Sequence, residues 1–528
     1  MLQDKHEYVR REAIGALGRC LVSSKKVIVT VAAMLEDPNK NVRYQVLSFL
    51  EGLASQKKAQ PWVYPYLAKS LKNAPWQIRL SIARLLWSYD AVVNLVVQDL
   101  SNALKDKNEW VRKAAAVSLG KVGFKAHKAL PHLHRLLKDK SQQVRKAVVL
   151  AVGKMGIKAE RSAPALMQLW GDAHSDLRKA ATLSLGRLGT KSHYVFSLLL
   201  KTLQSQDWRR RMYAAQTLRR TKVQKNRVVS ALLKLQKDKK WQVREAIFRA
   251  LGTTGGKSPL VVPLLIKKLK AQKKDIGAAA ATSLGELGAK AVKAIPALGH
   301  AISVDDGNVA IPALFALSKI GMYTSTDKCV QILIRALSRR SVYLQMAAAK
   351  AIRAMGTKAY KAVPALAKTI TNSVVEDPVG YQTDLQRELR FACVRTLEVM
   401  GRKALGASSA LVWAFRDRGR GLWWAISKTF RAIGPKAIPT LLKGIHSRNE
   451  HVRFGSARAL GRFGKKSSLG LLRELSSADE TRRYRTIIAI GHSRLKSRLF
   501  LVPLKKCLSD KNPKVRMAAK KVLQYLRH

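Results

Sequence analysis

The sequence predicts an all-α fold, an α-solenoid of about sixteen helical hairpins. A Val-Arg pair recurs along the 528 residues at a period close to 33. Each period holds two runs with helical apolar spacing, separated by a polar turn. Aromatic residues make up only 6% of the chain, which suits closely packed helices. Because one helical hairpin cannot bury its own apolar face, it needs a copy on each side, and the copies stack into an extended array.

Residues 108–156 show the repeat most clearly. The pair that ends in Arg112 returns with Arg145, 33 residues later. Pro131 begins the helix that lies between these two copies, and it fits the first helical turn because it has no N–H to leave unpaired. Gly123 ends the preceding helix, where a left-handed conformation is common. Each repeat is therefore expected to read helix, polar turn, helix and glycine stop.

The arginine of the Val-Arg pair is called the marker position. Its spacing is 33 residues except for steps of 36, 35, 45, 30 and 30, and fourteen of sixteen copies follow Val, Ile or Leu. The copies are Arg10, Arg43, Arg79, Arg112, Arg145, Arg178, Arg211, Arg244, Gly277, Ala310, Gln345, Arg390, Trp423, Arg453, Arg483 and Arg516. The first and last copies hold only the marker helix. Two explanations stay open: the sequence is a fragment of a longer chain, or a partner covers the apolar face at each end.

The pattern Leu-x-Asp-x-x-x-x-Val-Arg-x-x-Ala-x-x-x-Leu-Gly resembles the short HEAT repeat, the variant also seen in phycobilisome-lyase proteins. The resemblance covers essentially the whole chain and implies a right-handed superhelix of HEAT-like hairpins. It says little about function, because HEAT arrays serve as DNA binders, transport receptors, scaffolds and a few enzymes. Eight of the marker arginines have an Asp six residues earlier. The resemblance also implies that these aspartates and the marker arginines form a structural ladder across successive turns. These arginines are therefore poor candidates for ligand contact.

The charge indicates a polyanionic partner. The chain has 99 Lys and Arg against 33 Asp and Glu, a net charge of +66. Self-repulsion of this size needs an offset, for which nucleic acid is the leading candidate and an anionic membrane or an acidic protein the lesser ones. Composition predicts three segments: a basic N-terminal arm (1–274, strongly basic from 101), a near-neutral centre (275–400) with an enlarged loop around 372–386, and a basic C-terminal arm (401–528).

A lysine ladder is predicted thirteen residues after the marker, in ten of the sixteen copies. It follows the closing glycine and has no acidic partner in the repeat pattern. A lysine there can simply interact favourably with the carbonyl end of the helix dipole. A row of such lysines can also bind along a phosphate backbone. The ladder is Lys125, Lys158, Lys191, Lys257, Lys290, Lys358, Lys403, Lys436, Lys466 and Lys496, with Lys128 and Arg161 beside it.

Denser cationic clusters add further candidates for polyanion binding. They are Arg209, Arg210, Arg219, Arg220, Lys222, Lys225, Lys239 and Lys240 in the first arm, and Arg418, Arg420, Arg482 and Arg485 in the second. Trp208 and Trp241 precede marker helices among these cations. They can shield the turn as hydrophobic staples or stack against bases.

No catalytic residue, metal site or cofactor is predicted. Deoxyhypusine hydroxylase has a similar repeat but binds two irons through His-Glu pairs, whereas the corresponding positions here read Lys113-Ala114 and Lys146-Ala147. A DNA glycosylase of the HEAT type is a distant alternative, since Asp207, Trp208 and Arg211 are suitable residue types. The protein is therefore expected to be non-enzymatic, with a scaffold for an acidic protein as the main alternative to nucleic-acid binding.

The four cysteines lie far apart in no metal-binding spacing, which favours buried thiols in a reducing compartment. They are Cys20, Cys329, Cys393 and Cys507. The N-terminus shows no leader pattern, and no apolar run is long enough for a membrane span. A cytoplasmic, nucleic-acid-associated location is the expectation, with the oligomeric state left open.

Overall fold

The computed structural model describes residues 1–20, 24–55, 60–221, 224–270, 274–304, 307–324, 327–372, 381–417, 420–493, 495 and 497–527. Helices make up most of these residues, and no β-strand occurs among them. They divide into two compact units, residues 1–254 and 255–528. The expected all-α repeat array is confirmed. The three charge segments were defined by composition, and their boundaries at residues 274 and 400 differ from the boundary between the two units.

Unit 1 contains the first fifteen helices. In order they are α1 (Glu7–Arg19), α2 (Lys25–Ala33), α3 (Lys40–Ser55), α4 (Tyr64–Asn73), α5 (Trp76–Leu85), α6 (Val93–Ala103), α7 (Glu109–Val122), α8 (Leu130–Leu136), α9 (Gln142–Lys154), α10 (Ala163–Gln168), α11 (Ser175–Lys191), α12 (His193–Thr202), α13 (Trp208–Leu218), α14 (Lys225–Lys234) and α15 (Trp241–Thr254).

Unit 2 continues the same alternation. Its helices are α16 (Val261–Leu269), α17 (Lys274–Leu287), α18 (Ile295–Val304), α19 (Ala310–Tyr323), α20 (Asp327–Leu337), α21 (Val342–Met355), α22 (Val363–Asn372), α23 (Tyr381–Met400), α24 (Ser408–Trp413), α25 (Arg420–Ile433), α26 (Ile438–Gly444), α27 (Glu450–Gly461), α28 (Lys465–Leu475), α29 (Glu480–Ser493), α30 (Leu501–Lys506) and α31 (Pro513–Arg527).

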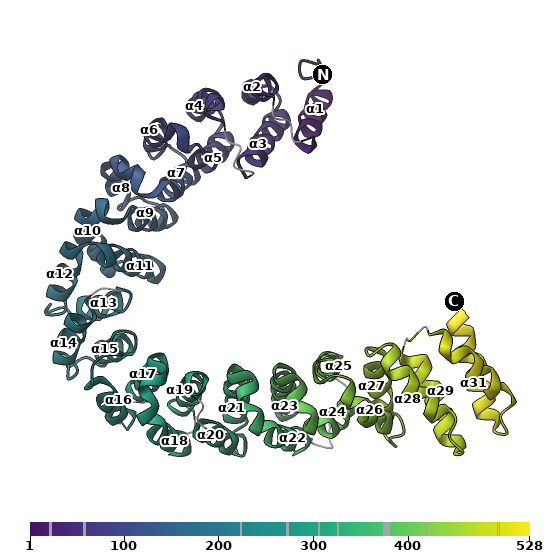
Figure 1. The fold of residues 1–528 in the computed structure, drawn as a ribbon. Coiled ribbons are helices and arrows are strands. Elements are labelled where there is room, and N and C mark those ends of the chain that lie inside the picture. Colours follow the sequence, from purple (N-terminus) through teal and green to yellow (C-terminus); the bar gives the residue numbers. More distant parts are fainter. Residues whose placement is uncertain are drawn as a thin grey trace. The chain divides into compact units, whose positions relative to one another are not determined.

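The odd-numbered helices carry the marker positions, and within each unit they stack on one another as one layer (Figure 1). The even-numbered helices form the other layer. The core lies between the layers and between neighbouring repeats, where Val111, Leu119 and Leu133 are fully buried. Because each marker helix buries one face against its own repeat and two flanks against its neighbours, only a narrow face stays exposed to solvent. Ligand-binding residues on these helices must come from that face.

Glycines set how closely the marker helices approach. A Cβ on Gly120 would lie 2.8 Å from the Cα of Ala151 on the next marker helix, so only glycine fits there. Gly123 has a φ of +71° at the end of α7, which is the predicted glycine stop. A short 3-10 segment, η5 (Gly123–Ala129), then leads into α8, whose first turn contains Pro131.

Two sequence expectations need correction. The enlarged loop around 372–386 is shorter than expected, because α23 already begins at Tyr381; residues 373–380 lie outside the described part. No Gly or Pro interrupts the sequence between Tyr381 and the marker Arg390, which suits a continuous helix from Tyr381. The expectation of buried thiols holds for three cysteines, but Cys20 is exposed.

Among the described residues no single helix is long and apolar enough to cross a membrane. One pair bent by 91°, Trp76–Ser88 with Asp90–Ala103, reaches that length and composition together.

Candidate nucleic-acid interface

The marker arginines form the structural ladder that the resemblance implies. Nε and Nη2 of Arg112 donate to Oδ2 and Oδ1 of Asp139 at 2.8 and 2.9 Å. Nη1 of the same guanidinium donates to the carbonyl oxygens of Asp106 and Lys107 in its own turn. One arginine thus joins two successive turns. The same carboxylate fork forms between Arg10 and Asp37, Arg79 and Asp106, Arg211 and Asp238, and Arg483 and Asp510.

Three aspartates of this ladder have lowered pKa values. Burial alone would raise the pKa of Asp139, but the hydrogen bonds from Arg112 and from the backbone N–H of Ser141 outweigh it and leave the pKa below its ordinary value. The pKa values of Asp106 and Asp238 are lowered by the same balance. These carboxylates therefore neutralise marker arginines and not the cations elsewhere on the surface.

At two of the four markers that are not arginine, Gln345 and Trp423, the bond within the turn persists. Nε2 of Gln345 donates to the carbonyl oxygen of Arg339 at 2.7 Å, and the indole Nε1 of Trp423 donates to that of Asp417. Both acceptors lie six residues before the marker, like Asp106 before Arg112. The carbonyl contact is thus kept by these two replacements, whereas Gly277 and Ala310 have no side-chain donor for it.

The lysine ladder lies at the opposite ends of the marker helices, in the connections to the following even-numbered helices. Its described members are exposed: Lys125 in η5, Lys158 in η6 (Gly156–Ser162), Lys191 at the end of α11, Lys257 between α15 and α16, Lys290 in η8 (Gly288–Ala294), Lys358 in η9 (Gly356–Ala362), Lys403 in η10 (Gly401–Ala407), Lys436 in η12 (Pro435–Ala437) and Lys466 in α28. Lys128 and Arg161 are exposed beside it, and Lys496 lies outside the described residues.

The expectation that this ladder has no acidic partner is wrong at Lys125. Its Nζ lies 2.7 Å from Oδ1 of Asp90, in the short segment η4 (Asp90–Val92) of the preceding repeat. Nζ of Lys358 donates to the carbonyl oxygen of Met322, so part of its hydrogen-bonding capacity is also used. Lys158 has no carboxylate partner in the part of the chain that the structure describes. The ladder is therefore less uniform than its spacing suggests.

The first-arm cluster is brought together around α13. Arg209 and Arg210 are exposed at its start, where Arg210 approaches Asp207 at 4.0 Å. Arg220 is exposed at its C-terminal end, and Arg219 is half-buried there. Lys225, Lys239 and Lys240 are exposed on the following elements; Lys222 lies outside the described residues.

Two arginines of the second-arm cluster already have partners within the protein. Arg482 approaches Glu474 at 4.0 Å, and Nη1 of Arg485 donates to the carbonyl oxygen of His446. Arg418 lies outside the described residues, as does the side chain of Arg420.

The two candidate stacking residues begin marker helices and are only half-exposed. Trp208 opens α13 with the guanidinium of Arg209 4.9 Å from its ring centre, and Trp241 opens α15. Their packing fits a shield over the turn, and base stacking at these rings stays a prediction.

Sequence reasoning missed most of a cationic row on the exposed face of the marker helices, nine residues after the marker. Its four members are all exposed: Lys121, Lys154 and Arg187 lie on α7, α9 and α11, and Arg220 lies in the turn that follows α13. Of these only Arg220 was among the candidates. We call these four residues the cationic row. The 33-residue spacing was the available signal, but the dense clusters drew attention away from it.

The glycines of the marker helices support the cationic row. A Cβ on Gly120 would lie 3.6 Å from Cδ of Lys154, and a Cβ on Gly186 would lie 2.9 Å from Cβ of Arg220. Each of these cations thus runs its aliphatic stem over a glycine of the preceding helix and keeps its charge in water. Lys121 instead lies 4.2 Å from the ring centre of Trp87. No member of the row pairs with a carboxylate within the described ranges.

The structure does not assemble the residue types of a HEAT-type glycosylase. Asp207 accepts the backbone N–H of Arg209 as the cap of α13, and Arg211 is held in its fork with Asp238. Among the described residues no group of three or more His, Cys, Asp or Glu could hold a metal ion.

Comparisons with known proteins agree with this architecture. A family model described as HEAT repeats matches residues 1–87, 64–151, 97–186, 130–219, 196–276, 229–318 and 420–491, together more than half of the chain. No match to a curated protein was found.

Among solved structures, the chain is similar to the karyopherin Kap121p bound to the SUMO protease Ulp1p, with 11% identity, a TM-score of 0.51 and coverage of 99% of this chain and 76% of that one. The chain is also similar to the Kap95:Nup1 complex, with 12% identity, a TM-score of 0.51 and coverage of 99% of this chain and 76% of that one. Its similarity to yeast importin-β (Kap95p) has 11% identity and a TM-score of 0.50, and covers 100% of this chain and 88% of that one. At these identities the likeness shows the fold alone.

Proposed function

The chain belongs to the HEAT-repeat family, and we propose that it is a non-enzymatic binding protein that holds nucleic acid through phosphate contacts along its Lys- and Arg-rich surface. The cationic row carries this proposal. The row places one exposed positive charge at the same position of four successive repeats, on α7, α9 and α11 and in the turn that follows α13. Stacked helices lie about 8–10 Å apart, so the charges repeat at that interval.

The distribution of acids supports a polyanion as the ligand. The turn aspartates are used by marker arginines, so they do not offset the cationic row. Residues 101–274 hold 40 Lys and Arg against 9 acidic residues. A dense line of uncompensated charge attracts a ligand that carries regularly spaced anions and releases counterions on binding. Phosphate contacts carry no base information, so little sequence preference is expected at this row. A cytoplasmic, nucleic-acid-associated location is part of the proposal.

Salt titration of binding tests the proposal. Affinity for a labelled short duplex would be measured by fluorescence anisotropy at several salt concentrations, with single-stranded DNA and RNA in parallel. For duplex DNA, log affinity falls with log salt by about 0.9 for each phosphate contacted. The triple variant Lys154→Gln/Arg187→Gln/Arg220→Gln is expected to reduce that slope by about 2.7, three contacts at 0.9 each.

A matched control separates the row from net charge. The variant Arg135→Gln/Lys201→Gln/Lys234→Gln removes three exposed cations from α8, α12 and α14, in the other helix layer of the same unit. It is expected to leave the slope nearly unchanged. If both triple variants weaken binding equally, attraction is a property of net charge and the row is not a binding surface.

The alternative partner is an acidic protein. It predicts weak nucleic-acid binding with a shallow salt slope, and one tight acidic partner whose affinity depends on a few buried anchor residues. The salt titration distinguishes the two, because a protein interface of that kind does not lose affinity linearly with log salt over many contacts.

A further inference from the structure

We infer that the exposed face of α23, α25, α27 and α29 in unit 2 binds single-stranded nucleic acid by stacking unpaired bases on aromatic side chains. The inference rests on the proposed function and adds the form of ligand that this face accepts. It concerns a different surface from the cationic row, which lies in unit 1.

An aromatic side chain stands one residue after the marker in four successive marker helices. We call these residues the aromatic row: Phe391, Trp424, Phe454 and Tyr484. Phe391, Trp424 and Tyr484 are 41, 52 and 37% exposed, and Phe454 is partly exposed. Because the four share one register position, they lie in line across the stacked helices. Helical repeats of other kinds bind one base per repeat, so this spacing suits a strand of unpaired bases.

A cation accompanies two of these rings on the same helix face. Nζ of Lys428 lies 5.1 Å from the ring centre of Trp424, and the guanidinium of Arg458 lies 5.6 Å from that of Phe454. Each cation is four residues after its ring, so it is the ring's neighbour along the helix. The face therefore presents flat apolar groups in one line and positive charges beside them. A single strand offers the complementary pair of lines, bases on one side and phosphates on the other.

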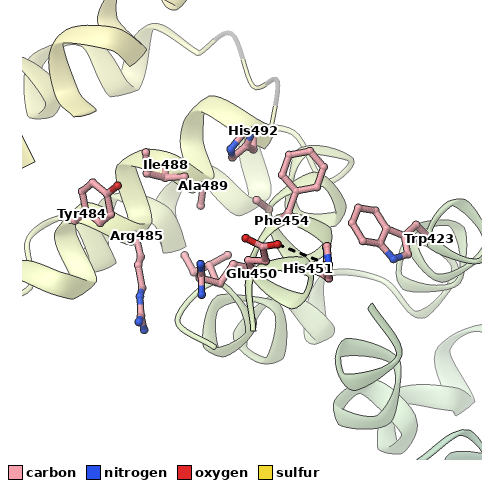
Figure 2. A pocket seen from close by; sticks show the side chains of 12 residues that line it. Trp423, Glu450, His451, Phe454, Tyr484, Arg485, Ile488, Ala489 and His492 are labelled. Atoms are coloured by element: carbon pink, nitrogen blue, oxygen red, sulfur yellow. Dashed lines mark ion pairs between the residues drawn. The ribbon is translucent and has the colours of Figure 1, made fainter. Parts of the chain in front are cut away.

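Two members of the aromatic row, Phe454 and Tyr484, line a pocket of about 440 Å³ between α25, α27 and α29. Figure 2 shows Phe454 between Trp423 and His492. The ring centres of Trp423 and Phe454 are 5.7 Å apart, and those of Phe454 and His492 are 4.5 Å apart. Tyr484 lies on the same pocket wall as Ile488 and Ala489. A pocket lined by several rings, with polar and charged side chains around them, fits a planar group that also forms hydrogen bonds, such as a base.

The polar groups of the pocket are arranged for the two parts of a nucleotide. Glu450 lies at one side, where it pairs with His451 at 3.8 Å, and Arg485 lies at another (Figure 2). A carboxylate accepts hydrogen bonds from the amino group of a base and repels phosphate, whereas a guanidinium attracts it. Burial, followed by the nearby Arg458, lowers the pKa of His492, which favours the neutral form of this ring.

In unit 1 the same register holds no run of successive rings, and Tyr44 on α3 is an isolated exposed aromatic side chain. There the residues after the markers of α7, α9 and α11 are Lys113, Lys146 and Lys179. On these three helices charges take the place of flat rings, so this part of the face offers phosphate contacts and no stacking at that register. The two units thus present different surfaces on one fold.

The test compares a base-bearing single strand with an abasic strand of equal length and phosphate number, using the full chain. The variant Trp424→Ala/Tyr484→Ala removes two exposed rings. It is expected to weaken binding of the base-bearing strand by roughly fivefold to 150-fold for each stacked base lost, and to leave the abasic strand unaffected. Quenching of 2-aminopurine fluorescence in the strand reports stacking directly and is expected to fall.

Two further variants control this measurement. Tyr323→Ala/Tyr360→Ala removes two exposed rings of unit 2 that lie outside the aromatic row and is expected to change neither strand. Trp424→Phe/Tyr484→Phe keeps flat rings and is expected to retain most of the affinity. Circular dichroism melting confirms that each variant is folded.

The inference is overturned if wild-type protein binds both strands equally, or if the alanine variant weakens them equally. Unchanged binding in the alanine variant also overturns it and assigns this face to another ligand, such as an acidic peptide. If duplex and abasic strands bind but bases add nothing, only this inference fails. If neither duplex nor abasic strand binds, the proposed function itself fails.

Discussion

Replacing Arg112 and Lys158 separately tests whether structural and ligand-binding charges have been distinguished correctly. Arg112→Ala removes two hydrogen bonds to Asp139 and two to backbone carbonyls of its own turn. The arginine side chain is 15% exposed and the aspartate 5%, so the remaining carboxylate would be largely buried without its partner. Lys158→Ala removes an exposed side chain without a carboxylate partner among the described residues.

The expected loss of stability differs strongly between the two. Hydrogen bonds to charged groups contribute about 1.5–3 kcal/mol, and removing one partner of a fully buried pair costs about 3–5 kcal/mol. The pair of Arg112 with Asp139 is nearly but not fully buried, and Asp139 keeps its bond from Ser141. We therefore expect Arg112→Ala to cost about 2–4 kcal/mol. A solvent-exposed lysine contributes within about 0.5 kcal/mol.

The expected loss of affinity has the opposite order. One phosphate contact changes log affinity by about 0.9 for each tenfold change in salt, so at 0.1 M salt Lys158→Ala is expected to weaken duplex binding about eightfold. Arg112→Ala is expected to change affinity less than twofold, about the precision of the measurement, because its guanidinium is occupied by Asp139.

Hydrogen exchange of the amides of α7 and α9 is the suitable stability assay, because repeat arrays unfold locally and a global melting temperature dilutes the effect. Anisotropy titration with a short duplex gives the affinities. Equal effects of the two substitutions on either property would refute the assignment of marker arginines to structure and ladder lysines to ligand.

Two other predictions concern the scaffold. The stabilisation from Asp106, Asp139 and Asp238, whose pKa values are lowered in the fold, is complete above their unfolded pKa near 4 and is lost as pH falls through the folded values. Melting temperature should therefore drop below about pH 4, and Asp139→Asn should flatten that dependence; a parallel acid profile for variant and wild type would contradict this. Gly153→Ala places a Cβ 2.4 Å from Oγ of Ser184 and should lower the melting temperature, whereas Gly171→Ala, with open space around it, should not.

The repeat fold could be predicted from sequence because its local signals agree with its packing. The marker period, Pro131 in the first turn of α8 and the positive φ of Gly123 all indicate the same hairpin. Individual partners could not be predicted. The pair of Lys125 with Asp90 joins residues 35 positions apart, and Trp423 replaces an arginine by donating from its indole to the same carbonyl position. Such contacts depend on the position of one side chain in one repeat, and a periodic pattern does not contain them.

The candidate site was found only in part because charge density is a poor guide to free charge in this fold. Twelve of the 99 Lys and Arg are marker arginines, and forks with turn aspartates occupy several of them. Arg211 shows the difficulty: it lies in the dense run Arg209–Arg211 but is held by Asp238. Register was the better signal, since Lys154 and Arg187 repeat at 33 residues on a face that packing leaves exposed.

Register also explains how one solenoid can carry two kinds of surface. Packing constrains the marker, the glycines eight residues later and the buried apolar positions, but not the positions one, five and nine residues after the marker, most of which face solvent. Position one holds Lys113 on α7 and Trp424 on α25, although both helices pack in the same layer arrangement within their units. Because these side chains add little to the core, a change there alters the ligand chemistry at small cost in stability. A cationic face in unit 1 and an aromatic face in unit 2 are therefore compatible with one repeat, and this is why the fold alone does not determine what the protein binds.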